Sequence, residues 1–223
     1  TLNYSAKIVS PGIDLWRPSN VFLSNSWVEL PDSTPWIVAN DITVAGSQSR
    51  LVITNTSITC GGSLSLTNGA TFYVWCGATS GGAPDYGALG DVGGTFSIGT
   101  NCWVYPISHP TNGGSALFRA GNLYFADTNC GFNVDGRGYR GGTATDIHGK
   151  GPGRSLGIGG GGSGGAGYGG AGGNGSTAGG VTYGSSNAPA DPGSGSGYVN
   201  AGGVPWGGGL VRALHLECAH AVG

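Results

Sequence analysis

The chain has 223 residues, of which 49 are Gly, and its formal net charge at pH 7 is −2. Charged residues make up 9% of it, far below the roughly 25% of an average soluble protein. A surface so poor in cations excludes a nucleic-acid interface, and no apolar run approaches the roughly 18 residues of a membrane span. Low charge also favours association between copies of the chain.

Residues 1–20 begin with one short alternating stretch. Its apolar side chains, which would project to one side of a strand, are Leu2, Tyr4, Ala6 and Ile8. This pattern predicts an edge strand, which pairs either with the sheet of its own chain or with a neighbouring copy.

Residues 21–135 contain a succession of short apolar stretches with a period of two, separated by turn residues. They lie at 21–23, 28–30, 37–38, 42–44, 51–53, 58–60, 64–66, 72–74, 96–98, 102–104, 123–125 and 132–134. The pattern predicts an all-β fold, either a solenoid of stacked rungs or a sandwich with many turns. We favour a short right-handed parallel β-solenoid, because Asn, Thr, Ser and Gly separate the apolar positions as corner residues would. Residues 77–94 are expected to form a loop that leaves the stack.

Residues 136–209 hold 31 of the 49 glycines. Such a segment is unsuited to a helix, since each interior Gly costs about 1 kcal/mol relative to Ala. It is either a flexible linker or a bundle of polyproline II runs, as in polyglycine II, packed side by side. We favour the bundle, because Gly recurs at every third residue from Gly161 to Gly173. Tyrosines also recur at intervals of 15 residues, at Tyr168, Tyr183 and Tyr198.

Residues 210–223 contain an alternation typical of a strand, at Leu210, Arg212, Leu214, Leu216 and Cys218. The spacing of Val211, Leu214 and Cys218 also suits a helix. We predict a strand that returns to the solenoid.

Five cysteines occur, and none has the Cys-x-x-Cys spacing of a zinc or iron–sulfur site. They are Cys60, Cys76, Cys102, Cys130 and Cys218. Burial as small apolar side chains and formation of one or two disulfides are both open, and the odd number leaves at least one thiol free or paired between chains. No metal and no cofactor are expected.

Four aromatic residues fall on the opposite parity from the apolar residues of their strands, and they are Tyr73, Trp75, Trp103 and Tyr105. The parity predicts an exposed ladder that stacks on sugars or contacts another subunit; packing under a loop is the alternative. The carboxylates are single and scattered, so no catalytic residues and no enzymatic activity are expected.

Three short sequence motifs mark the start, the middle and the end of the glycine-rich segment. They are Asp-Gly-Arg-Gly-Tyr at 135–139, Gly-Tyr-Gly-Gly at 167–170 and Gly-Gly-Gly-Leu-Val-Arg at 207–212. Together they resemble the glycine-rich insert of large exported β-solenoid surface proteins of bacteria. In that family the first motif carries Lys where Arg137 stands, and the last carries Ala-Ile where Leu210-Val211 stand. The resemblance implies an extracellular or cell-surface location and brings no catalytic residues.

These features predict an extracellular structural protein that self-assembles through open β edges into a filament or surface layer, with copies of itself as partners. The second hypothesis is a surface adhesin, a module that binds glycans through its exposed Trp and Tyr residues. An ice-binding protein and a carbohydrate-active enzyme are further alternatives.

Overall fold

The computed structural model describes residues 2–3, 16–30, 32–79, 86–158, 162–185, 191–201, 204–206 and 215–218. Across these residues the regular secondary structure consists of strands alone, so the chain is all-β as predicted. A helix long and apolar enough to cross a membrane is absent from the described ranges.

Sheet A has nine strands, and every pair in it is parallel. Its main path runs β1-β2-β5-β8-β10-β12-β16, while β7 joins it at β10 and β4 pairs with β7. The bounds are β1 Leu2–Asn3, β2 Val21–Ser24, β4 Trp36–Val38, β5 Ile42–Ala45, β7 Ser57–Cys60, β8 Leu64–Thr67, β10 Ala88–Ile98, β12 Ala116–Phe125 and β16 His215–Cys218.

Sheet B has five parallel strands in the order β13-β11-β9-β6-β3. Their bounds are β3 Trp27–Glu29, β6 Arg50–Thr54, β9 Thr71–Trp75, β11 Trp103–Ile107 and β13 Gly131–Phe132. One register line crosses the whole sheet, through Trp27, Arg50, Thr71, Trp103 and Gly131.

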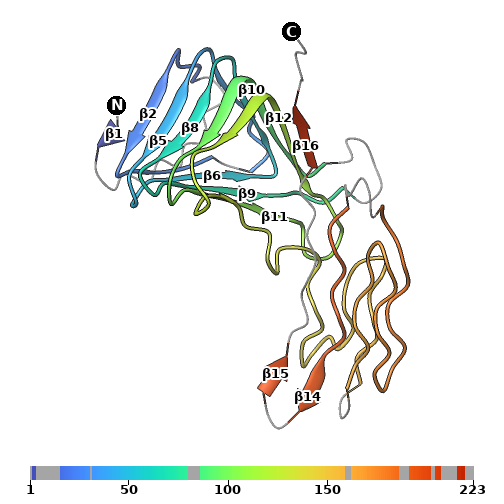
Figure 1. The fold of residues 1–223 in the computed structure, drawn as a ribbon. Helices are drawn as coiled ribbons and strands as arrows, with labels where there is room; N and C mark the ends of the chain where they lie inside the picture. The colour runs from blue at the N-terminus through green and yellow to red at the C-terminus, as the bar shows by residue number, and fades with distance from the viewer. Residues whose placement is uncertain are drawn as a thin grey trace.

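The chain passes alternately through the two sheets, and each new pass pairs with the one before it. Val21 pairs with Ile42, Ile42 with Leu64, and Leu64 with Phe96. Strands β10 and β12 are longer than the other strands. The first part of β10 pairs with β7 and its last part pairs with β8, so β10 extends past two shorter strands of the preceding pass. The strands therefore stack in sequence order, from blue to green in Figure 1.

The core lies between the sheets and is made of the alternating apolar residues. In sheet A the inward residues of β5 and β8 are Ile42, Val44, Leu64 and Leu66, all fully buried. Matching inward residues of sheet B join them in one cluster, namely Val28, Leu51, Ile53, Phe72, Val74 and Val104. The two-residue period of the sequence thus gives the correct inward face of these strands.

Two strand segments depart from the sequence prediction. The loop expected at 77–94 is a strand from Ala88 onward, and residues 116–120 form the first half of β12. The first of these strands was not predicted because Gly90 interrupts its apolar alternation. A tertiary contact requires this glycine, since a Cβ built at Gly90 would lie 2.7 Å from Cδ1 of Phe118. An aromatic ring from the next pass fills the space that a side chain would take.

Asparagine occupies left-handed backbone at several turns between strands, with φ of 47° at Asn25, 46° at Asn55, 56° at Asn68 and 60° at Asn101. Asn tolerates this conformation better than most residues, because its short side chain can hydrogen-bond locally. At the turn after β6 the Asn55 amide donates to the Ser33 hydroxyl at 3.0 Å. Polar bonds between successive turns thus accompany the strand register.

The glycine-rich segment leaves the sheets as long runs that lie side by side (Figure 1). Backbone N–H groups bridge these runs: Gly165 donates to Gly173, Gly172 to Gly180 and Gly180 to Gly165, at 2.8, 2.9 and 2.9 Å. A Cβ built at Gly179 would lie 1.9 Å from the Gly172 carbonyl oxygen. Only Gly allows such contact between backbones, so the described part of the segment is packed rather than a free linker.

The three-residue glycine period holds for part of this segment. A Cβ at Gly164 or Gly167 would lie 2.5 Å from the Ala178 oxygen or 2.3 Å from the Val181 oxygen. Gly173 has no atom within 4 Å of such a Cβ, and an antiparallel bridge joins Tyr168 to Gly170 before it. Gly161 lies outside the described residues.

Two of the three regularly spaced tyrosines lie in contact with each other. The rings of Tyr168 and Tyr183 meet edge to face, with centroids 5.0 Å apart. Burial raises the pKa of Tyr183 to about 12. Tyr198 is also buried, at 7% exposure, and its N–H donates to the Ile147 carbonyl at 2.8 Å. The rings therefore act as apolar packing between the glycine runs.

An ion cluster ties the start of the segment together. The Asp146 carboxylate accepts from Lys150 Nζ at 2.9 Å and from the Arg140 guanidinium. These hydrogen bonds, with that from Lys150 the larger cause, hold the pKa of Asp146 below its usual value of 3.8. The carboxylate stays charged at neutral pH and links two neighbouring turns.

The last described strands end the fold. β14 (Val199–Ala201) and β15 (Val204–Trp206) form an antiparallel pair, and β16 then returns to sheet A beside β12. At residues 215–218 the predicted C-terminal strand is therefore present, and for these four residues the helical alternative is wrong.

Candidate functional site

The outward face of sheet B carries the aromatic residues. Because its strands are in register, outward side chains form straight lines across the sheet. One line contains Glu29, Val52, Tyr73 and Tyr105, and the next contains Thr54, Trp75 and Ile107. The four residues predicted as an exposed ladder, Tyr73, Trp75, Trp103 and Tyr105, all lie on this face.

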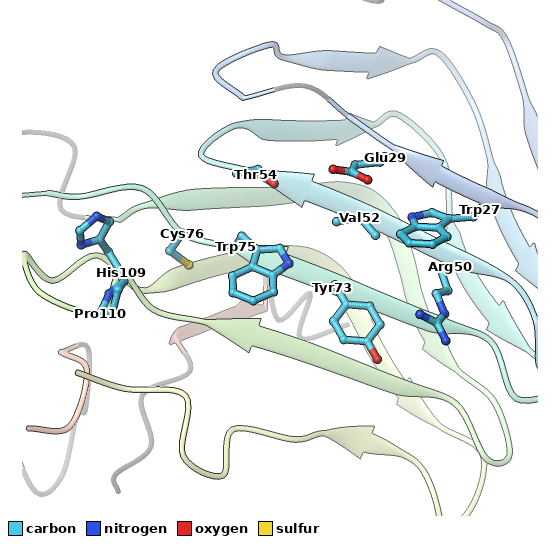
Figure 2. A pocket seen from close by; sticks show the side chains of 10 residues that line it. All are labelled: Trp27, Glu29, Arg50, Val52, Thr54, Tyr73, Trp75, Cys76, His109 and Pro110. Carbon is cyan, nitrogen blue, oxygen red and sulfur yellow. The ribbon is translucent and has the colours of Figure 1, made fainter. Parts of the chain in front are cut away.

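A groove of about 700 Å³ runs over β3, β6 and β9 on this face. Figure 2 shows its side chains above the strands, with Trp27 and Arg50 toward one end, Tyr73 and Trp75 between, and His109 and Pro110 at the other. Trp75 is 48% exposed and Trp27 is 37% exposed. Two indole rings of this size at a solvated surface form an apolar floor open to a ligand.

Two guanidinium groups flank the aromatic rings. The Arg50 guanidinium carbon lies over the Trp27 ring at 5.5 Å, and that of Arg137 lies over the Tyr105 ring at 4.6 Å. Tyr105 in turn stacks on Tyr73, with centroids 4.7 Å apart and an interplanar angle of 22°. Stacking fixes the orientation of these long side chains, so their N–H donors are held in place before any ligand binds.

The end wall of the groove is also fixed by local bonds. Nδ1 of His109 accepts from the Asn112 N–H at 3.1 Å, so Nε2 is the nitrogen that carries the ring proton. Cys76, at the same end, is buried at 8% exposure. Burial raises the pKa of the Cys76 thiol to about 12, so it stays protonated and is a poor nucleophile at neutral pH.

The chemistry of the groove suits binding. Among the described residues that line it, Glu29 is the one carboxylate, whereas glycoside hydrolysis generally requires two. In the described ranges no cluster of three or more His, Cys, Asp or Glu side chains could hold a metal ion. What the groove offers is flat rings, a hydroxyl on Thr54 and the donors of Arg50.

The sequence predicted part of this site. Tyr73 and Trp75 line the groove, whereas Trp103 and Tyr105 lie beside it on the same face. Trp27 and Arg50 were not among the four residues of the predicted ladder, although each also alternates with a buried neighbour, Val28 and Leu51. That parity was the available signal, and the structure places both residues on the same groove as Trp75.

The candidate assembly strand is described in part. Leu2 and Asn3 form β1, which pairs in parallel with Leu23 and Ser24 of the same chain. Tyr4, Ala6 and Ile8 lie outside the described residues. Residues 2–3 therefore pair with the sheet of their own chain.

Four of the five cysteines have described side chains, and all four are free thiols. Cys60, Cys76 and Cys102 are buried, which matches burial as small apolar residues, and Cys130 is half-buried. The structure therefore contains no disulfide among these four described cysteines. Cys218 lies in β16, beside Ala120.

Comparisons with protein-family models, with curated protein sequences and with solved structures found no match to this chain. The functional argument therefore depends on the groove itself.

Proposed function

We propose that the chain is an extracellular adhesin-like module that binds glycans in the groove of sheet B and is not an enzyme. The observation that carries the proposal is the pair of exposed indoles, Trp27 and Trp75, set across one groove with the stacked guanidinium of Arg50. The C–H face of a sugar ring packs on an aromatic ring while its hydroxyls bond to polar groups at the rim. Arg50, Glu29 and Thr54 provide such groups.

The architecture we propose for this module is a right-handed parallel β-solenoid that carries a polyproline II bundle. Repeated passes through two parallel sheets favour the solenoid, and parallel crossovers are right-handed in about 98% of cases. The close contacts between glycine backbones favour the bundle. Both features, with few charges, suit an extracellular or cell-surface protein of the exported bacterial kind that the sequence resembles.

Replacing Trp75 by Ala is expected to weaken glycan binding at least about 10-fold, since truncating a central aromatic anchor removes about 2 kcal/mol or more. A glycan array on the intact protein would first identify a ligand, and titration calorimetry would then measure its affinity for each variant. Trp75 is 48% exposed, so its loss should leave folding intact.

Trp103→Ala is the matched control, because Trp103 lies on the same face but outside the groove. Its affinity should stay within about twofold of the unmodified protein. An array without a single hit, or equal losses in the two variants, would reject the groove as a glycan site.

A second function, self-assembly into a filament or surface layer, is favoured by the polarity of sheet B. Its end strands β3 and β13 are parallel, so β13 of one copy could pair with β3 of the next and continue the same pattern. Such a head-to-tail contact does not close on itself and extends into a fibre. Electron microscopy and light scattering should show regular filaments; a monomer at every concentration would reject this function.

A further inference from the structure

A tripeptide recurs on two successive passes of the chain. Thr100-Asn101-Cys102 leads into β11, and Thr128-Asn129-Cys130 leads into β13. The pairing of Trp103 with Gly131 sets the two copies in register, so that Cys102 lies next to Cys130. Strands in one sheet are about 4.8 Å apart, within the 4.4–6.8 Å that a disulfide requires between its Cα atoms.

Backbone and side-chain bonds hold the two tripeptides against each other. The Asn101 N–H donates to the Asn129 carbonyl at 2.9 Å, and the Gly131 N–H donates to the Cys102 carbonyl at 3.2 Å. The side-chain amide of Asn129 donates to that of Asn101. Bonds on both sides of the cysteine pair thus fix its spacing.

The two thiols differ in access to solvent. Cys102 is fully buried, whereas Cys130 is half-buried and donates from Sγ to the Asp127 carbonyl at 3.0 Å. Burial, with a smaller contribution from the nearby Cys130, raises the pKa of the Cys102 thiol. One accessible and one enclosed thiol at adjacent positions are what an attacking and a resolving cysteine require.

We propose that Cys102 and Cys130 form a disulfide when the protein meets a low-molecular-weight disulfide such as oxidised glutathione. The Cys130 thiolate attacks one glutathione sulfur and releases a first glutathione thiol. The Cys102 thiolate then attacks the Cys130 sulfur of the mixed disulfide and releases the second. Two protein thiols are oxidised, one glutathione disulfide is reduced to two thiols, and the protons of Cys102 and Cys130 pass to the glutathiones.

The position of this bond gives it a structural role beyond glycan binding. β13 has only two residues, is the last strand of sheet B, and is followed directly by the glycine-rich segment. A bond from Cys130 to the preceding pass fastens the base of that segment to the sheets.

The test is to incubate the full chain in a glutathione redox buffer at pH 8 and to map its peptides without reduction. We expect a link between Cys102 and Cys130, the loss of two hydrogens from the intact mass, and a rise in Tm of about 5–10 °C. Reduction should reverse both changes.

Cys102→Ala separates this bond from other thiol chemistry, and Ala70 already fills the equivalent position on the preceding pass. In this variant Cys130 should stop at the mixed disulfide with glutathione, with no rise in Tm. Cys76→Ala should form the link as the unmodified chain does. An unmodified chain whose Cys130 stays a thiol, stops at the mixed disulfide or joins another cysteine would overturn the proposal.

Discussion

Replacing Gly180 by Ala is expected to unpack the glycine-rich segment, with a loss of about 3 kcal/mol of its local stability, the upper end of the usual cost of overpacking. A Cβ at this position would lie 1.8 Å from the Gly153 carbonyl oxygen and 2.8 Å from the Gly167 nitrogen. Both obstacles are backbone atoms, so no rotamer change relieves the clash. The runs would have to separate, and the bond from the Gly180 N–H to the Gly165 carbonyl at 2.9 Å would be lost with them.

Hydrogen exchange followed by mass spectrometry measures this effect, as the loss of amide protection in residues 162–185. Gly173→Ala is the matched control, because no atom lies within 4 Å of its Cβ and its φ is not left-handed. That variant should keep its protection, with a gain of up to about 1 kcal/mol from a less flexible unfolded chain. Equal behaviour of the two variants would contradict backbone packing in this segment.

Replacing Phe118 by Ala should destabilise the sheets by about 3–5 kcal/mol, the usual cost of removing a fully buried aromatic ring. Phe118 is 2% exposed, and its ring centroid lies 6.1, 5.8 and 5.3 Å from those of Phe72, Phe96 and Phe132. Its loss would leave a cavity bounded by several passes of the chain. Urea unfolding followed by tryptophan fluorescence gives the change in the free energy of unfolding.

Phe22→Ala is the control for this measurement, since Phe22 is a phenylalanine of sheet A that is 44% exposed. Surface substitutions of this kind usually change stability by less than about 0.5 kcal/mol, and some loss of packing raises that only slightly. A loss in Phe118→Ala no larger than in Phe22→Ala would show that the aromatic cluster does not support the fold.

Residue alternation predicted the strands well because it depends only on the backbone. Side chains of a strand point to opposite faces in turn, so Ile42 and Val44 face inward whatever their partner strand is. The same rule placed Tyr73 and Trp75 outward. It failed at Ala88–Val92, where Gly90 interrupts the apolar pattern to make room for Phe118. A residue whose identity is set by a distant contact, as Gly90 is by Phe118, does not fit the local apolar period.

By itself the sequence determined the all-β class, the inward and outward faces of most strands and the unusual nature of the glycine-rich segment, because composition and a two-residue period are local properties. Only the tertiary structure decided which distant residues meet. The strand register brings Cys102 beside Cys130 and sets Trp27 and Trp75 on one groove. The path of the glycine runs puts backbone atoms against Gly180 and leaves open space at Gly173. Strand register and chain path depend on the lengths of the turns and insertions between passes. The identities of the residues that come into contact do not reveal those lengths, so the contacts could not be predicted from the local sequence.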